Sequence, residues 1–456
     1  MWPEVNSTLA SLAARYLRPW RDSGISLAAV DEAHFKWADY RDEQWGGYVP
    51  LGTFNNRLLR INIIGNRLYY FGCVGSTSMR RLARQEAALR LLQSVLDARG
   101  LPDVDLVLSI SDRPTVPCAA VRPGSAPPPV FAYALTPSHF AIPFPPVSFD
   151  PRRWAPLHAR MLTDTHPPLQ GRKPVALWRG SCNSLCDMMR GRKQCSWARD
   201  AALLPRTALL RAASRCPRVS DVGITTSHRH CHGYTPKRPV PMSQHAHHAL
   251  VVHVDGNGFS GRLDELLTLG AAVLKQDSPF TAYYYPLLRA GTHYHPLHRN
   301  LSDLCRSARS LAHSLKGSPN ASSSVGGPSG GIGGGIGRAE TLANGAAAFA
   351  RAYLAPAGVE AYVHTLLRQY AALQRFTPAV HPRAVAWSGG GVGHAGGRAT
   401  RRRAAPMGRS AGVAAGGTAR AAAAAAVPPA RRASVERCAD ERCCRRHPKA
   451  RGCPSG

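Results

Sequence analysis

The stretch from residue 249 to residue 275 constrains the fold more than any other part of the sequence. It begins with an apolar, strand-like run, Ala249–Val254, followed by a turn of small residues, Asp255–Gly258. An amphipathic run then starts at Ser260, and a second apolar run, Ala271–Lys275, comes after it. The order strand, glycine turn, helix, strand predicts a βαβ unit of a parallel sheet.

This unit offers a binding site for phosphate. Backbone N–H groups in the first turn of a helix can bind phosphate oxygens, and Arg262 adds a fixed positive charge there. The alternative is an ordinary βαβ turn with a surface arginine. A single match to the pattern does not decide between these two interpretations.

Two upstream segments also place polar residues where a strand is expected to end. Val104–Ile110 reads as an apolar strand and runs into the sequence SDRP at residues 111–114. A shorter apolar run that begins at Pro174 ends in WRGS at residues 178–181. Open α/β sheets bind ligands just outside the carboxyl ends of their strands, so both segments are candidates for one site.

Hydrophobic periodicity and turn residues predict the surrounding elements. The expected helices are Trp2–Arg18, Met79–Arg99, Trp154–Leu162, Leu342–Leu354 and Val359–Leu373. Arg60–Phe71 is expected to form a β-hairpin that turns at Gly65 and Asn66. Pro127–Pro146 is expected to be a proline-rich connection.

Several motifs occur in a fixed order along the chain. Besides SDRP and WRGS, they are NRLYYF (Asn66–Phe71), PVFAYALTPSHFAIPFPPVSF (Pro129–Phe149), DGNGFSGR (Asp255–Arg262) and HYHP (His293–Pro296). From about Leu9 to Phe376 the chain resembles the family-90 glycosyltransferases. These include protein O-glucosyltransferases and O-xylosyltransferases of the secretory pathway and fungal capsule xylosyltransferases. An ordered set of motifs is far more specific than any one of them.

The resemblance implies an α/β fold of the GT-B type, with two Rossmann-type lobes and the donor site between them. It implies inverting transfer of glucose or xylose from a UDP-sugar to a hydroxyl of a protein or glycan acceptor. The alternative is a non-catalytic binding protein that retains the fold. No metal cofactor is expected, because arginines and a helix N-terminus would offset the charge of the leaving diphosphate.

The resemblance also implies roles for residues at the three strand ends. Asp112, in the Asp-x-Pro motif, is the expected catalytic base, which takes the proton of the acceptor hydroxyl. The residues expected to bind the donor are Arg179, Gly180, Ser181, Gly258, Phe259, Ser260, Gly261 and Arg262.

Each of these roles has a structural alternative. Asp112 could instead stabilise a turn, in which case Asp255 is the next candidate for the base. Arg179 could pin its strand end to a neighbouring loop rather than contact the donor. His293 and Tyr294 could line a base or ribose pocket, or they could only pack.

Composition and the resemblance together divide the chain into three parts. Residues 1–150 are expected to include the acceptor-side lobe, and residues 151–376 the donor-binding lobe with the terminal helices. A segment rich in Gly and Ser, 317–337, is predicted to be a flexible insertion. Residues 377–456 are rich in Gly, Ala and Arg and poor in large apolar residues, and they are predicted to be a disordered basic tail.

The net charge of +31 and the pI of 10.6 raise the question of nucleic-acid binding. The tail contributes fifteen Lys and Arg against three Asp and Glu, but it lacks interleaved aromatic residues. The chain also contains no recognisable nucleic-acid module, so no specific nucleic-acid partner is expected. The His-rich stretch 228–248 and the cysteines of 438–453 lack the paired spacing of familiar zinc sites.

The expected compartment is the lumen of the endoplasmic reticulum or Golgi, mainly because of the resemblance. Twelve cysteines would permit disulfides there. No apolar run approaches the ~20 residues that a membrane-spanning helix needs. The first residues, MWPEVNSTLA, do not show the pattern of a secretory signal. Either a signal lies upstream of Met1 or the protein works elsewhere.

Overall fold

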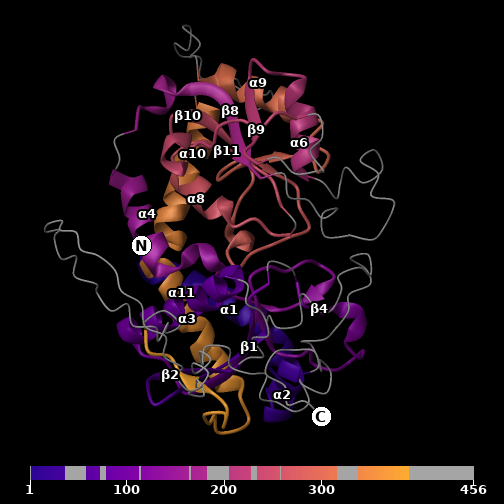
Figure 1. Ribbon diagram of the computed structural model, residues 1–456, viewed down its shortest axis with the longest axis vertical. Helices are drawn as coiled ribbons and strands as arrows, with labels where there is room; N and C mark the ends of the chain where they lie inside the picture. The colour runs from indigo at the N-terminus through magenta and orange to yellow at the C-terminus, as the bar shows by residue number, and fades with distance from the viewer. Residues whose placement is uncertain are drawn as a thin grey trace, which may run out of the picture.

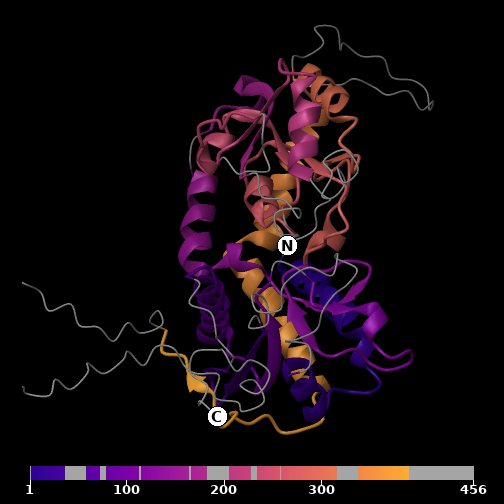
Figure 2. The same ribbon diagram turned by 45° about the vertical axis from the view of Figure 1, so that its right-hand side comes forward.

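The computed structural model describes residues 2–35, 58–71, 79–111, 114–163, 166–181, 205–226, 234–256, 258–315 and 337–389. These residues form a mixed α/β structure with two main sheets, which confirms the expected α/β class. Figures 1 and 2 show the sheet of the later residues above and the sheet of the earlier residues below. The orange helix α11 (Pro356–Leu373) returns to the lower part.

The lower sheet has six strands. In spatial order they are β13 (Val385–Ala386), β2 (Arg67–Phe71), β1 (Leu58–Ile64), β3 (Val104–Ser109), β5 (Val130–Ala132) and β7 (Ile142–Pro143). β5 and β7 run parallel to β3, and the other pairs are antiparallel. The β1–β2 hairpin turns where predicted, because Gly65 and Asn66 both have positive φ, at 54° and 58°.

The prediction that Pro127–Pro146 is a plain connection is wrong. It contains β5, β7 and also β6 (His139–Phe140), which pairs with β4 (Val116–Pro117) in a separate two-stranded sheet. Strands of two or three residues are too short to show a period-two pattern, which is why periodicity missed them.

Helices α1 (Trp2–Leu17), α2 (Leu27–Phe35) and α3 (Met79–Arg99) belong to the lower part, and the 3₁₀ turn Arg18–Trp20 follows α1. Helix α11 packs against α1, α3 and β3. Helix α11, at the end of the expected range 151–376, thus packs on the lower part. The apolar face of α11 contributes to the core of the lower part, and Val363, Leu366 and Tyr370 on it are fully buried.

The tail begins later than predicted. Within the expected disordered region 377–456, residues 377–389 pack on the lower sheet, and β13 pairs with β2 at the sheet edge. The ring of His381 stacks on Phe71 with centroids 4.6 Å apart, and Trp387 is 9% exposed. Isolated aromatic residues in a glycine-rich and arginine-rich context gave no periodic signal, so composition placed the boundary too early.

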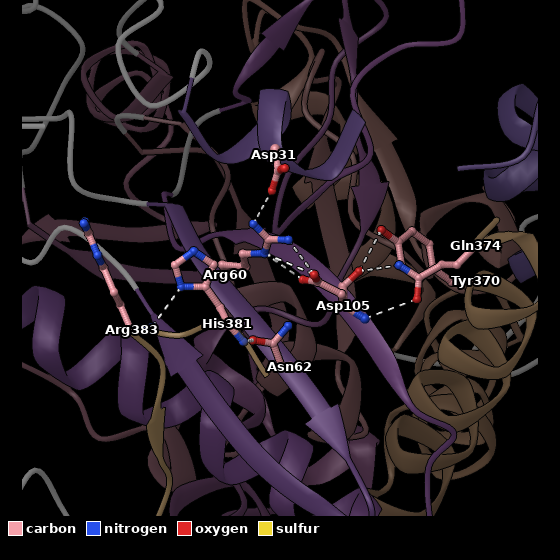
Figure 3. Close-up of polar contacts among 8 residues, drawn as sticks. All are labelled: Asp31, Arg60, Asn62, Asp105, Tyr370, Gln374, His381 and Arg383. Carbon is pink, nitrogen blue, oxygen red and sulfur yellow. Dashed lines mark hydrogen bonds and ion pairs between the residues drawn. The ribbon is translucent and has the colours of Figure 1, made fainter. Parts of the chain in front are cut away.

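A buried polar cluster holds the start of this segment to the sheet (Figure 3). Arg60 on β1 donates hydrogen bonds to both oxygens of Asp105 on β3, at 2.9 Å and 2.6 Å for the closest contacts. Gln374, just after α11, bonds to the backbone N–H and C=O of Asp105. His381 N–H donates to Asn62 Oδ1 at 3.1 Å. These bonds satisfy polar groups that would otherwise be buried without partners.

The upper sheet is entirely parallel. In spatial order its strands are β12 (His295–Leu297), β11 (Ala272–Gln276), β10 (His248–His253), β8 (Lys173–Gly180) and β9 (Ser220–Ile224). Both its faces are covered, because Leu250 and Val252 of β10 belong to one apolar core and Val251 to the other. The predicted strand, turn, helix, strand unit is present as β10, α8 and β11.

Helices cover this sheet on both sides. The helices that contact its strands are α6 (Pro205–Ser214), α7 (Met242–His245), α8 (Arg262–Thr268), α9 (Leu304–Ser314) and α10 (Gly337–Phe349). Helix α4 (Pro151–Thr163) and the π-helical turn Ala350–Leu354 pack against α8. A disulfide joins Cys216, just after α6, to Cys305 on α9. Residues 317–336 of the predicted insertion lie outside the described residues, and Gly337 begins α10. Among the described residues, no helix combines the length and apolarity needed to span a bilayer.

Candidate functional site

The upper sheet has a topological switch point between β8 and β10. The chain leaves β8 for β9 on one side and then crosses to β10, β11 and β12 on the other. In open α/β sheets of this order, ligands bind outside the carboxyl ends of the two strands that flank the reversal. Here Gly180 ends β8 and Ser181 follows it, and Asp255 and Gly256 come just after the end of β10.

Arg179 does not point into the switch point. Its guanidinium bonds to Trp178 O and Asp221 O, to the Asp221 carboxylate at 2.7 Å, and to Arg238 O. Asp221 lies on β9, so this arginine ties β8 to its neighbouring strand. Of the two roles considered for Arg179, the geometry favours the structural one.

Arg262 lies at the switch point, in the first turn of the helix where the sequence analysis expects it. It is the first residue of α8, its guanidinium carbon is 5.8 Å from the centre of the Trp178 indole, and it donates to Arg179 O. Burial lowers the pKa of Arg262. A Cβ on Gly180 would lie 2.7 Å from the Trp178 ring and 3.3 Å from Arg262 Nη1, so only glycine fits beside this pair.

A second arginine, which the sequence analysis did not select, joins the two strand ends. Arg206, in the first turn of α6, donates to the backbone and side-chain oxygens of Ser181 at 2.8 Å and to Asp255 O at 3.2 Å. Its guanidinium carbon lies 5.9 Å from the Trp178 ring centre. Burial, followed by the charge of Arg262, lowers the pKa of Arg206 to about 10. Two like charges are thus held near one indole.

A histidine at the end of β10 holds the glycine loop that precedes α8. His253, at the end of β10, bonds through Nε2 to Ser260 O at 3.2 Å. A Cβ on Gly256 would lie 2.8 Å from Arg206 Nη2, so the backbone there runs very close to the guanidinium. Phe259 is buried, and Gly261 caps α8. Arg206 therefore lies beside Gly256, whose backbone N–H donates to the oxygen of Gly258, the first residue of the expected donor-binding segment 258–262.

Lys275 on β11 is a second residue that sequence reasoning missed. It is 8% exposed, and its ammonium lies 5.0 Å from the Tyr285 ring centre and 5.5 Å from that of Tyr294. Tyr294 therefore contacts a cation, whereas His293 packs against Phe349 at 5.0 Å. The available signal was a lysine inside the apolar run AAVLKQ, where an unpaired charge is costly.

The three cations Arg206, Arg262 and Lys275 create positive potential at the end of β10. Burial lowers the pKa of His253 to about 3, and the charges of these three residues lower it as well. Burial raises the pKa of Asp255 to about 6, although a hydrogen bond from Ser278 and the charge of Lys275 oppose the rise. The site is thus positively charged and largely shielded from water, which suits a strongly anionic ligand.

Comparison with known proteins identifies the family. The model of glycosyl transferase family 90 matches residues 52–326, more than half of the chain. The chain belongs to glycosyl transferase family 90. The matched region contains β1 to β12, including the switch point, and the family expected from the ordered motifs is confirmed.

Part of this family-90 protein is similar in sequence to two protein O-glucosyltransferases. Over 58 residues it is 41% identical to protein O-glucosyltransferase 3 of Homo sapiens and, equally, to that of Rattus norvegicus. The match covers 13% of this chain and 11% of each relative, so the chain spans about a tenth of the relatives' length. Together with the family match, this likeness supports glycosyl transfer.

Asp112, the expected base, lies outside the described residues, which stop at Ser111 and resume at Pro114. Within the ranges that the structure describes, no three His, Cys, Asp or Glu side chains gather as metal ligands. The expectation of a metal-independent enzyme stays a prediction.

Proposed function

We propose that this family-90 protein transfers glucose or xylose from a UDP-sugar to a hydroxyl of a protein or glycan, with inversion at the anomeric carbon. The observation that carries the proposal is the convergence of Arg206 and Arg262 beside one indole at the switch point of the upper sheet. Lys275 adds a third positive charge at the same edge. A departing diphosphate needs such charge most as its bond to the sugar breaks.

Two of these cations also have N–H groups that can donate hydrogen bonds to a ligand. Within the described residues, Arg206 Nη2 has no protein acceptor, and Lys275 Nζ has only the long 3.5 Å contact to Gln276 O. Planar guanidinium groups bind phosphate oxygens in pairs, and an ammonium acts as a point charge. We assign the diphosphate to these three residues and to the backbone of 258–261, with no metal ion.

We assign the catalytic base to Asp112, which follows β3 of the lower part. The upper and lower parts are then the two lobes of a GT-B enzyme, with the donor between them. The acceptor hydroxyl loses its proton to the Asp112 carboxylate as its oxygen attacks the anomeric carbon, and UDP departs on the side of Arg206 and Arg262. Attack on the face opposite the departing UDP inverts the configuration at the anomeric carbon.

We place the protein in the lumen of the endoplasmic reticulum or Golgi. The Cys216–Cys305 disulfide supports this placement, because disulfides persist in oxidising compartments.

A binding experiment tests the nucleotide part of the proposal. UDP at about 100 times its dissociation constant stabilises a protein that binds it only when folded by about 2.7 kcal/mol, which is visible in the melting midpoint. We expect this shift in the presence of EDTA, and its loss in Arg206→Ala and Arg262→Ala. Arg211→Ala is the matched control, because Arg211 is an exposed residue of the same helix as Arg206. A wild-type protein that UDP does not stabilise would contradict the proposal.

A further inference from the structure

One acidic side chain lies buried among the cations at the carboxyl end of β10. Asp255 is 7% exposed, and Ser278 Oγ donates a hydrogen bond to its Oδ2. The cations whose charges act on it are Arg206 on α6, Lys275 on β11 and Arg299 after β12. Within the described part of the chain, no Lys or Arg nitrogen lies within ion-pair distance of the Asp255 carboxylate.

We propose that Asp255 is an internal counter-ion of the diphosphate site, which sets how tightly the nucleoside diphosphate product is held and how fast it leaves. The inference rests on the proposed function, since it concerns the same site. It goes further by giving a residue outside the donor-binding set a role in product release.

The position of Asp255 suits this role. A carboxylate in direct contact with Arg206 or Lys275 would occupy the N–H groups that a phosphate needs. Asp255 instead contacts Arg206 only through its backbone oxygen, at 3.2 Å, and its side chain is held by Ser278. The carboxylate therefore weakens the positive potential without blocking the donors. It also reduces the cost of burying several like charges when no ligand is bound.

The consequence for turnover follows from the charge balance. The positive potential that stabilises the leaving diphosphate in the transition state also binds the free product, and product release limits the rate of many transferases and other enzymes. Removing the negative charge of Asp255 from among these cations should tighten the binding of the diphosphate about tenfold. Release should slow by a similar factor, because most changes of affinity at one site appear in the dissociation rate.

The test is a calorimetric titration of the full chain with UDP and with inorganic pyrophosphate at about pH 8. We expect Asp255→Asn to bind both probes about tenfold more tightly than wild type. The Asn side chain can still accept the hydrogen bond from Ser278, so folding should be retained, and the melting midpoint checks this. Asp277→Asn is the matched control: it removes the same charge from an exposed position two residues after Lys275 and should change the affinity less than twofold.

A second measurement uses wild type alone. UDP-glucose carries a diphosphate diester that does not titrate near neutral pH, so its affinity should rise several-fold as the pH falls through about 6 and Asp255 takes up a proton. The titratable groups that face Asp255 are Arg206, Lys275, Arg299 and the Tyr285 hydroxyl. An equal pH effect in Asp255→Asn would overturn the counter-ion role, because a group other than Asp255 would then be taking up the proton.

The outcomes separate the two claims. Wild type that binds neither UDP nor UDP-glucose overturns the proposed function, and the counter-ion role with it. Wild type that binds both, with a folded Asp255→Asn that binds them no more tightly, overturns the counter-ion role alone. An equal gain of affinity in Asp277→Asn would also overturn it, because a general charge effect would then account for the result.

Discussion

Replacing Asp264 by Asn should change how the stability of the protein depends on pH. Asp264, on α8, is fully buried, and it accepts hydrogen bonds from Ser148 Oγ at 2.5 Å and from the Tyr284 hydroxyl. Burial raises its pKa from 3.8 to about 7, which these two bonds only partly oppose. A buried carboxylate of this kind holds its proton in the folded protein over a range of pH in which the unfolded chain has already lost it.

This difference in proton binding sets the sign and the size of the change in the free energy of unfolding with pH. Between about pH 4 and pH 7 only the folded state binds the proton, so the free energy of unfolding falls as the pH rises. A pKa that moves from 3.8 to about 7 corresponds to a loss of at most about 4 kcal/mol, which is complete above pH 7. In the Asn variant this contribution is absent. Wild type should be the more stable protein near pH 4, by about 1 kcal/mol from its better hydrogen bonds, and the variant should be the more stable near pH 8.

Urea unfolding of both proteins at several pH values between about 4 and 8 measures this crossover. The quantity of interest is the difference between the two free energies of unfolding, because other titrating groups cancel in it. Asp97→Asn, at an exposed position of α3, controls for the removal of a surface charge. A difference that stays constant across the whole range would refute the reasoning, since Asp264 would then titrate alike in the folded and unfolded states.

Three further predictions concern the tail, the disulfide and the base. Truncation after Gly389 should leave the melting midpoint unchanged, whereas truncation after Phe376 should lower it, because the second cut removes β13 and the buried Trp387; thermal scans compare the two. Cys216→Ser should lower the free energy of unfolding by about 2–4 kcal/mol under oxidising conditions and have no effect in reductant, as urea curves would show. Asp112→Asn should lower transfer ~100-fold or more, with UDP affinity unchanged in a titration; near-normal transfer would exclude Asp112 as the base.

The sequence predicted the parts of the fold that have strong local signals. Met79–Arg99 is a helix with the predicted bounds, because its periodic apolar face ends at Gly100, which has a positive φ of 66°. The β10, α8, β11 unit was also predicted, since it combines two apolar strands with a glycine turn. Neither β5 nor β13 has such a signal, because strands of two or three residues depend on neighbours that are distant in the sequence.

The candidate site was predicted in part. The motif placed Arg262 in the first turn of the helix after β10, where it lies, but Arg206 and Lys275 were found only in the structure. Arg206 reaches Ser181 and Asp255 only because the fold brings the first turn of α6 beside the residues that follow β8 and β10. The same limit explains Arg179: its motif marked a strand end, and only the pairing of β8 with β9 shows that its side chain bonds to Asp221. Motif spacing gives the position along the chain, whereas side-chain direction depends on tertiary contacts.

The central claim is that Arg206 and Arg262 bind the diphosphate of a UDP-sugar for transfer. It is tested most directly by measuring UDP release by the full chain from UDP-glucose, UDP-xylose and UDP-galactose, with protein and glycan acceptors and EDTA present. Release of GDP from GDP-mannose is the control for the identity of the nucleobase in the donor. We predict acceptor-dependent release from UDP-glucose or UDP-xylose, and its loss in Arg262→Ala. Binding of UDP without any transfer would favour a non-catalytic binding protein, and release from GDP-mannose alone, or equal rates in Arg262→Ala, would contradict the account.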